Sequence, residues 1–266
     1  MMQNPSAGRC RMKRFTVSAT KTKKTLPWLR ALAVLFWMIL WQWGSMVVGS
    51  DLILPSPMST LQALGTIFLE QEFWGDVGWT LLRVFGGIAI SILVGYVLGV
   101  ICGLWQGVYC LVKPVATILR TLPIVSVIIL INLWVKSGWV PLAVSFMVCF
   151  PIVWTNVVEG IWRTDLKLLE MAQVFGVSIY RVVRGIYLPS VRPYLRAAVM
   201  NAIGMGWKAT VTAEVLANAL PSMGMELYYS KIYLETPTLF AWTLVLVAAS
   251  FAIEGGVRLV LRGREV

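Results

Sequence analysis

The stretch that decides the fold is residues 165–189, DLKLLEMAQVFGVSIYRVVRGIYLP. Asp165 is placed to cap a helix over residues 166–175, because a carboxylate at this position accepts a hydrogen bond from the free N–H groups of the first turn. Gly176 is the residue type that adopts the left-handed conformation ending a helix, and Ser178 can cap a second helix. The stretch therefore predicts a helical hairpin that turns at Gly176.

The hairpin lies within a basic loop, residues 159–196, which long apolar runs flank on both sides. Its second helix should end before Pro189, because a residue that precedes proline disfavours helical geometry. Of the 266 residues, 58% are hydrophobic and 13% are charged, whereas roughly 25% are charged in an average soluble domain. Since about 20 apolar residues cross a bilayer as a helix, we predict an all-α membrane protein with six transmembrane helices. The expected spans cover residues 31–48, 77–105, 115–135, 139–158, 197–216 and 239–261.

The distribution of charge predicts how these spans are oriented. The formal net charge is +11. Lysines and arginines gather in residues 1–30, in the loop 159–196 and near the end of the chain, whereas Lys136 and Lys231 fall in the expected outer loops. Because basic residues concentrate on the cytoplasmic side, we expect an N-in, C-in membrane protein. Residues 1–30 would then be a cytoplasmic tail and residues 31–266 one transmembrane domain, and nucleic-acid binding is not needed to explain the charge.

Small residues and prolines indicate how the spans pack. A close-packed ridge is expected along the second span, because small residues recur at every fourth position and allow another helix to approach. The prolines of the third and fourth spans, Pro123, Pro141 and Pro151, are tolerated where neighbouring helices satisfy the freed carbonyls. Ser59 is expected to cap a short amphipathic helix before the second span. The ridge consists of Gly87, Ser91, Gly95, Gly99 and Gly103.

Several classes of chemistry lack their usual residues. The sequence contains no His, which removes the commonest general base and the Ser-His and Cys-His pairs. Its four cysteines show no Cys-x-x-Cys spacing, so a zinc or disulfide framework has little support. No Gly-x4-Gly-Lys-Ser/Thr stretch is present to hold ATP phosphates. We therefore expect a protein that is not an enzyme and that carries no metal or cofactor of its own.

Two interpretations compete for the hairpin. A DNA-binding helix-turn-helix would also use Ala172, a turn at Gly176 and a helix starting at Ser178. Alternatively, the hairpin is a docking element for another protein. The DNA-binding interpretation explains neither the end of the stretch, Ile186-x-Leu188-Pro189, nor the spans around it.

The docking interpretation rests on a resemblance to a known family. The pattern Glu170-x-Ala172-x3-Gly176-x9-Ile186-x-Leu188-Pro189 resembles the EAA loop of ABC importer permeases. One position departs from the family pattern, because Met171 stands where the middle alanine of the Glu-Ala-Ala triplet is usual. The resemblance implies the type I importer permease fold, with cytoplasmic coupling helices between the fourth and fifth spans that dock on an ATPase.

Shorter motifs are similar to the nitrate, taurine and aliphatic sulfonate permease subfamily. They are Leu54-Pro55-Ser56-Pro57, Leu81-Leu82-Arg83-Val84, Pro114-Val115 and Leu119-Arg120-Thr121-Leu122-Pro123. The resemblance implies a bacterial or archaeal inner-membrane location, a homodimer, separate ABC ATPase subunits that hold ATP and Mg, and a soluble or lipid-anchored substrate-binding protein. The expected substrate is a small anion such as nitrate, taurine or an alkanesulfonate. An uncharged, aromatic or vitamin-precursor ligand is the alternative substrate, and an ion channel is the alternative function.

Polar residues in the fifth span are candidates for the substrate pathway. Ionisable side chains inside a membrane are costly, so Lys208 and Glu214 are functional candidates by default. Asn201, Lys208 and Thr212 share one helix face, and Glu214 lies on another. In one interpretation, Lys208 meets an anionic substrate between two copies of the chain. In the other, it forms a structural ion pair with Glu254 or Glu214.

Overall fold

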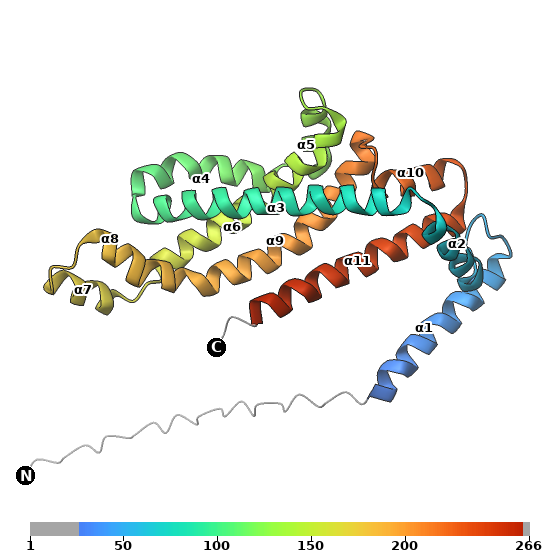
Figure 1. The fold of residues 1–266 in the computed structure, drawn as a ribbon, viewed down its shortest axis with the longest axis horizontal. Helices are drawn as coiled ribbons and strands as arrows, with labels where there is room; N and C mark the ends of the chain where they lie inside the picture. Colours follow the sequence, from blue (N-terminus) through green and yellow to red (C-terminus); the bar gives the residue numbers. More distant parts are fainter. Residues whose placement is uncertain (1–26, 263–266) are drawn as a thin grey trace, which may run out of the picture.

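The computed structural model describes residues 27–262, which contain helices and connecting loops (Figure 1). Most of the expected basic tail, residues 1–30, lies outside the described residues. The elements in order are α1 (Pro27–Val48), α2 (Pro57–Leu69), α3 (Phe73–Leu104), α4 (Gln106–Thr121), α5 (Ile124–Asn132), the 3₁₀ helix η1 (Ser137–Trp139), α6 (Val140–Trp162), α7 (Leu166–Val174), α8 (Ile179–Val182), the π-helix η2 (Val183–Tyr187), α9 (Leu188–Ala217), α10 (Met223–Ile232) and α11 (Thr236–Arg262).

Three long helices, α3, α6 and α9, form the centre of the bundle (Figure 1). The small-residue ridge of α3 packs directly on α6, as the sequence predicts. A Cβ atom added at Gly99 would lie 2.7 Å from Cβ of Val157, and one added at Gly95 would lie 2.9 Å from Cβ of Val153. Real Cβ atoms essentially never approach other atoms this closely, so glycine is required at both positions.

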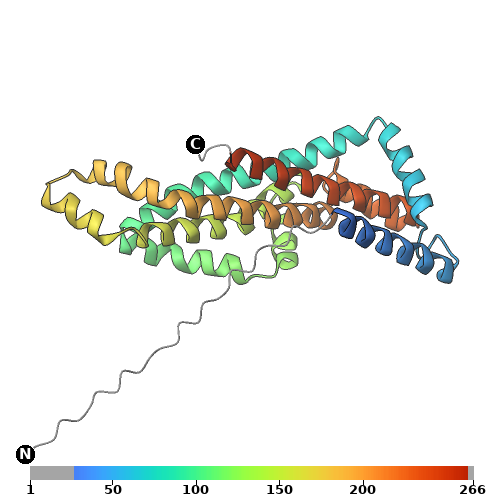
Figure 2. The same cartoon turned by 90° about the horizontal axis from the view of Figure 1, so that it is seen from below.

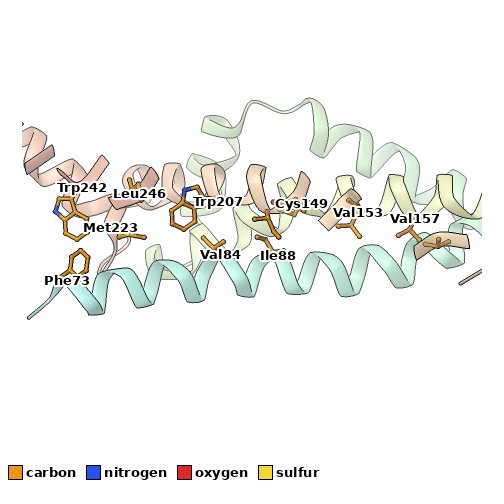
Figure 3. Close-up of a cluster of buried hydrophobic side chains, with 14 of the residues drawn as sticks. Phe73, Val84, Ile88, Cys149, Val153, Val157, Trp207, Met223, Trp242 and Leu246 are labelled. Carbon is orange, nitrogen blue, oxygen red and sulfur yellow. Dashed lines mark hydrogen bonds between the residues drawn. The ribbon is translucent and has the colours of Figure 1, made fainter. Parts of the chain in front are cut away.

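Apolar side chains from these three helices fill the space between them. Figure 3 shows Val84 and Ile88 of α3 beside Cys149 and Val153 of α6, with Trp207 of α9 above them. All five side chains are buried. Burying an aliphatic side chain of this size contributes roughly 1.5–3 kcal/mol in water, whereas between helices in lipid the close packing itself stabilises the contact.

Four described helices are long and apolar enough to cross a membrane, and they lie within Ala31–Val48, Phe73–Leu104, Ser137–Trp162 and Thr236–Val260. They correspond to the first, second, fourth and sixth expected spans. Residues 197–216 lie within α9, which is long enough to span but is not among these four apolar helices. The fifth span, and with it the total of six, therefore stays a prediction.

The third expected span, residues 115–135, is broken at Pro123, as the proline in this run predicts, and is not one continuous helix. The chain forms α4 and α5 instead, and their axes are bent by 103°. The break falls at Leu122, which is extended with ψ 133°, directly before Pro123. Proline disfavours a helical conformation in the residue before it. Helices α4 and α5 together therefore form either one broken membrane span or a re-entrant segment.

The start of α2 also differs from the expectation. Ser56 is the N-cap in place of Ser59, because its hydroxyl accepts a hydrogen bond from the Ser59 backbone N–H at 3.1 Å. Pro57 occupies the first helical position, where its missing N–H costs nothing. Helix α1 meets this region through Trp41, whose Nε1 donates to the carbonyl oxygen of Pro55 at 3.0 Å.

Candidate functional site

The hairpin, residues 165–187, has the local structure that its sequence predicts at the turn. Asp165 Oδ1 accepts a hydrogen bond from the Lys167 backbone N–H at 2.9 Å and so caps α7. Gly176 has φ +63°, a conformation that side chains with a Cβ rarely adopt. The Val177 N–H returns to the carbonyl oxygen of Ala172 at 2.9 Å, which closes the end of α7. These bonds fix the direction in which the chain leaves α7.

The second half of the hairpin corrects one expectation. The helix beginning at Ile179 does not end before Pro189 but continues through the π-helix η2 into α9. Pro189 has no backbone N–H and would clash with a carbonyl in a regular helix. The wider π-helical turn just before it lets the chain remain helical. The expected coupling residues Ile186 and Leu188 are half-buried on this continuous rod, and Pro189 is exposed.

Helix α7 presents apolar side chains to the outside at one end of the molecule. In Figures 1 and 2 the hairpin extends beyond the end of α4. Val174 is 83% exposed and Leu166 is 70% exposed, whereas Ala172 is buried and anchors the helix. Glu170 is also exposed. An uncovered apolar helix on a polar, charged loop is typical of a surface that docks another protein.

The polar face of α9 (Asn201, Lys208 and Thr212) is exposed in this chain. The neighbouring positions Ala202 and Ala209 are completely or almost completely buried against the bundle. The hydroxyl of Thr212 donates to the carbonyl oxygen of Lys208 at 2.8 Å, so it is turned along its own helix. The structure therefore brings these three predicted residues onto one face that the described helices leave uncovered.

Glu214 does not belong to that face, and the suggested pairing of Lys208 with Glu214 is wrong. Glu214 is 0% exposed, and its Oε1 lies 3.1 Å from Nη1 of Arg83 on α3. Its Oε2 accepts hydrogen bonds from Thr80 Oγ1 at 3.0 Å and from the Gly224 backbone N–H at 3.3 Å. A buried carboxylate is tolerated when it is paired and hydrogen-bonded in this way.

Arg83, the ion-pair partner of Glu214, has a role that the sequence did not reveal. Besides Glu214, it donates to the carbonyl oxygen of Pro221 at 2.8 Å and, through Nε, to that of Gly138 at 3.0 Å. It therefore ties α3 to α9, to the loop before α10 and to the start of α6. An arginine inside an apolar run was the available signal, but its partner is far away in the sequence.

Carboxylates gather at the end of the molecule where α10 lies. Burial, together with the negative charges of Asp76, Glu70 and Glu72, raises the pKa of Glu226 to about 7. Within residues 27–262, no group of three or more His, Cys, Asp or Glu side chains is arranged to hold a metal ion. Cys102 and Cys149 are buried free thiols.

Comparison with known proteins supplies independent findings. The model of the family described as "Binding-protein-dependent transport system inner membrane component" matches residues 95–265. The chain is 24% identical over 236 residues to a putative aliphatic sulfonates transport permease protein of Bacillus subtilis strain 168, covering 88% of this chain and 84% of the relative. It is 25% identical over 228 residues to the taurine transport system permease protein of Escherichia coli K12, covering 84% and 82%.

A bicarbonate transport system permease protein of Synechococcus elongatus is 24% identical over 229 residues, covering 76% of this chain and 77% of the relative. Among solved structures, an inward-facing conformation of the MetNI methionine ABC transporter contains a chain of similar fold, with a TM-score of 0.56 and 16% identity. That similarity covers 71% of this chain and 93% of the other.

Proposed function

The chain belongs to the family of binding-protein-dependent transport system inner membrane components, and from that membership we propose that it forms the substrate pathway of an ATP-driven importer and couples it to a separate ATPase. It is a transport subunit and not an enzyme. ATP and Mg are then bound and used by the partner chain. A soluble or lipid-anchored binding protein delivers the substrate at the outer face, and the end that carries α7 lies in the cytoplasm, with both termini on that side.

The observation that carries this proposal is the exposed apolar helix α7 between α6 and α9. An amphipathic helix lodged in a groove of a partner transmits rigid-body motion to the helices that hold it. The cap at Asp165 and the left-handed turn at Gly176 fix α7 relative to the bundle. After the turn at Gly176, α8, η2 and α9 follow one another without a break, and α9 carries the polar face. Movement of the ATPase would thus pass from α7 through the turn at Gly176 into the continuous helical rod that ends in α9.

The coupling is tested by exposed substitutions that leave the fold intact. Leu166→Asp and Val174→Asp place charges on the exposed apolar side chains of α7. We expect both variants to insert in the membrane but to lose co-elution with the ATPase encoded beside the permease. Gln106→Asp is the matched control, because Gln106 is exposed at the start of α4 and outside the hairpin. Gly176→Asp should also uncouple, since it strains the turn. Retained co-elution in all of these variants would refute docking through α7.

The proposed substrate is a small anion, in line with the sulfonate, taurine and bicarbonate relatives. Lys208 supports an anionic substrate, because a lysine on an uncovered polar face inside an expected span requires a partner of opposite charge. The same face is where a second, identical copy would meet this one across a two-fold axis, with Asn201 and Thr212 beside it. We therefore assign the pathway to the polar face of α9 in a homodimer.

Transport assays in proteoliposomes distinguish the proposal of an anionic substrate from that of an uncharged one. With the binding protein and ATPase present, Lys208→Gln is expected to lower uptake of the anion while leaving assembly intact. Thr243→Val is the matched control, because Thr243 is exposed on α11, outside the polar face of α9. Full uptake with unchanged selectivity in Lys208→Gln would contradict the assignment of Lys208. Uptake of only uncharged or aromatic ligands by the unmodified system would favour the alternative substrate class.

A further inference from the structure

A separate cavity of about 380 Å³ lies between α4 and α6, on residues that the coupling helix and the polar face of α9 do not use. Its aromatic wall is Tyr109, Trp154 and Trp162, and its polar wall is Thr155, Glu159 and Arg163, of which the last two form an ion pair at 3.0 Å. The ring of Tyr109 stacks on that of Trp154 at 5.6 Å and meets Trp162 edge-on at 4.8 Å. In Figure 1, α4 lies along the half of the bundle that carries α7 and α8.

Three basic side chains surround this cavity. Arg120 Nη2 donates to Oγ1 of Thr155 at 2.6 Å, and Lys113 Nζ lies 5.4 Å from the centre of the Tyr109 ring. Arg163 pairs with a neighbouring carboxylate of α6. Over the part of the chain that the structure describes, the ion pairs within 4.0 Å involve neither Lys113 nor Arg120. The surroundings of the cavity therefore carry an excess of positive charge.

Hydrogen-bond donors lie at the cavity, in the guanidinium group of Arg163 in its wall and in that of Arg120 beside Thr155. Trp154 is 5% exposed, and its Nε1 is a buried donor without a hydrogen-bond partner. Guanidinium, ammonium and indole N–H groups donate and do not accept. The matching ligand is therefore an anion with several acceptor oxygens. A phosphate group has this chemistry and forms strong hydrogen bonds with arginine.

The position of the cavity distinguishes a lipid from a soluble anion. It lies at the end of α6, where Trp162 and Arg163 lead into the basic loop, and aromatic and basic side chains gather at the inner membrane interface. Next to it, α4 exposes apolar side chains, with Leu111 76% exposed. Basic pockets between transmembrane helices on the cytoplasmic side bind anionic headgroups. We propose that this cavity holds the phosphate headgroup of an anionic inner-leaflet phospholipid, whose acyl chains lie along α4.

This inference rests on the proposed function for its orientation, because α7 must lie on the cytoplasmic side. The test uses the complete complex with its ATPase, titrated with phosphatidylglycerol and measured by native mass spectrometry. Each basic residue near an anionic lipid contributes about a five-fold factor in affinity. Lys113→Gln combined with Arg120→Gln should therefore weaken phosphatidylglycerol binding by about 25-fold. Lys136→Gln combined with Lys231→Gln removes the same charge from the expected outer loops and should leave binding unchanged.

A conservative variant keeps the test independent of folding. Trp154→Phe keeps one aromatic ring and removes the N–H donor together with the second ring, so it should weaken binding with no loss of complex. Equal phosphatidylglycerol binding in the double variant and in its control would overturn the proposal. Competition by inorganic phosphate at the same site would identify a soluble-anion site and also overturn it. Co-elution of the ATPase is read in the same sample, so failure of the lipid site is distinguishable from failure of the proposed function.

Discussion

Removing one partner of the buried ion pair between Arg83 and Glu214 should strongly destabilise the protein. Glu214→Gln keeps the size of the side chain but leaves the guanidinium of Arg83, which is 3% exposed, without a counter-charge. Breaking a buried pair in this way typically costs about 3–5 kcal/mol. Glu159→Gln is the matched control, because Glu159 pairs with Arg163 on the surface with 47% and 65% of their side chains exposed. An exposed pair contributes roughly 0–1 kcal/mol.

Thermal unfolding of the permease in detergent measures this difference through the fluorescence of its 13 tryptophans. A change of 1 kcal/mol shifts Tm by about 2–4 °C for a soluble chain of roughly this size. Glu214→Gln should therefore lower Tm by about 6 °C or more, and Glu159→Gln by less than about 4 °C. Adding Arg83→Gln to Glu214→Gln should recover part of the loss, because no charge then remains buried alone. Equal and small shifts in both single variants would refute the assignment of Arg83 and Glu214 as a stabilising pair.

Three other variants test separate parts of the structure. Gly99→Ala should lower the free energy of unfolding by about 1–3 kcal/mol, because the new methyl group would clash with Val157. Gly255→Ala should not lower it, because no atom lies within 4 Å of a Cβ placed there. Equal Tm values for the two variants would contradict the close packing of α3 on α6. Because its folded pKa lies above its usual value, Glu226 should make the protein more stable as pH falls from about 7 toward 4.5. Glu226→Gln should therefore reduce the slope of Tm against pH in this range, and an unchanged slope would contradict the contribution of Glu226. Thr80→Val removes the hydrogen bond that Thr80 donates to Glu214 and the one that it accepts from the Met223 backbone N–H. The free energy of unfolding should fall by about 1–3 kcal/mol, measured by the same thermal assay. An unchanged Tm would argue against a stabilising role for the hydrogen bonds around Glu214.

Local features of this fold could be predicted from the sequence because their physical causes are local. The cap at Asp165 and the turn at Gly176 depend on residues within one helical turn, and the ridge of α3 follows from a four-residue spacing. Ser59 was wrongly expected as a cap because Ser56 and Pro57 together form a better start to the helix. Competing local signals of this kind are resolved only by the geometry of the whole segment.

Features that join distant segments could not be predicted in the same way. Arg83 and Glu214 are separated by 131 residues, and no periodicity connects them, so the sequence offered Lys208 as an equally reasonable partner. The break at Pro123 was expected but its angle of 103° was not, because a proline in an apolar run is compatible with either a kink or a complete break. Which one occurs depends on the packing of α5 against α6 and α9, a tertiary contact.

Site-directed cross-linking from the coupling helix tests the central claim most directly. A photoreactive amino acid at position 174, in place of Val174, would be activated in membranes that contain the complete transporter. We expect a covalent product between the permease and the ATPase subunit, and no such product when the same group is placed at position 106. Cross-linking at position 106 but not at position 174, or at neither, would contradict docking of the ATPase on α7.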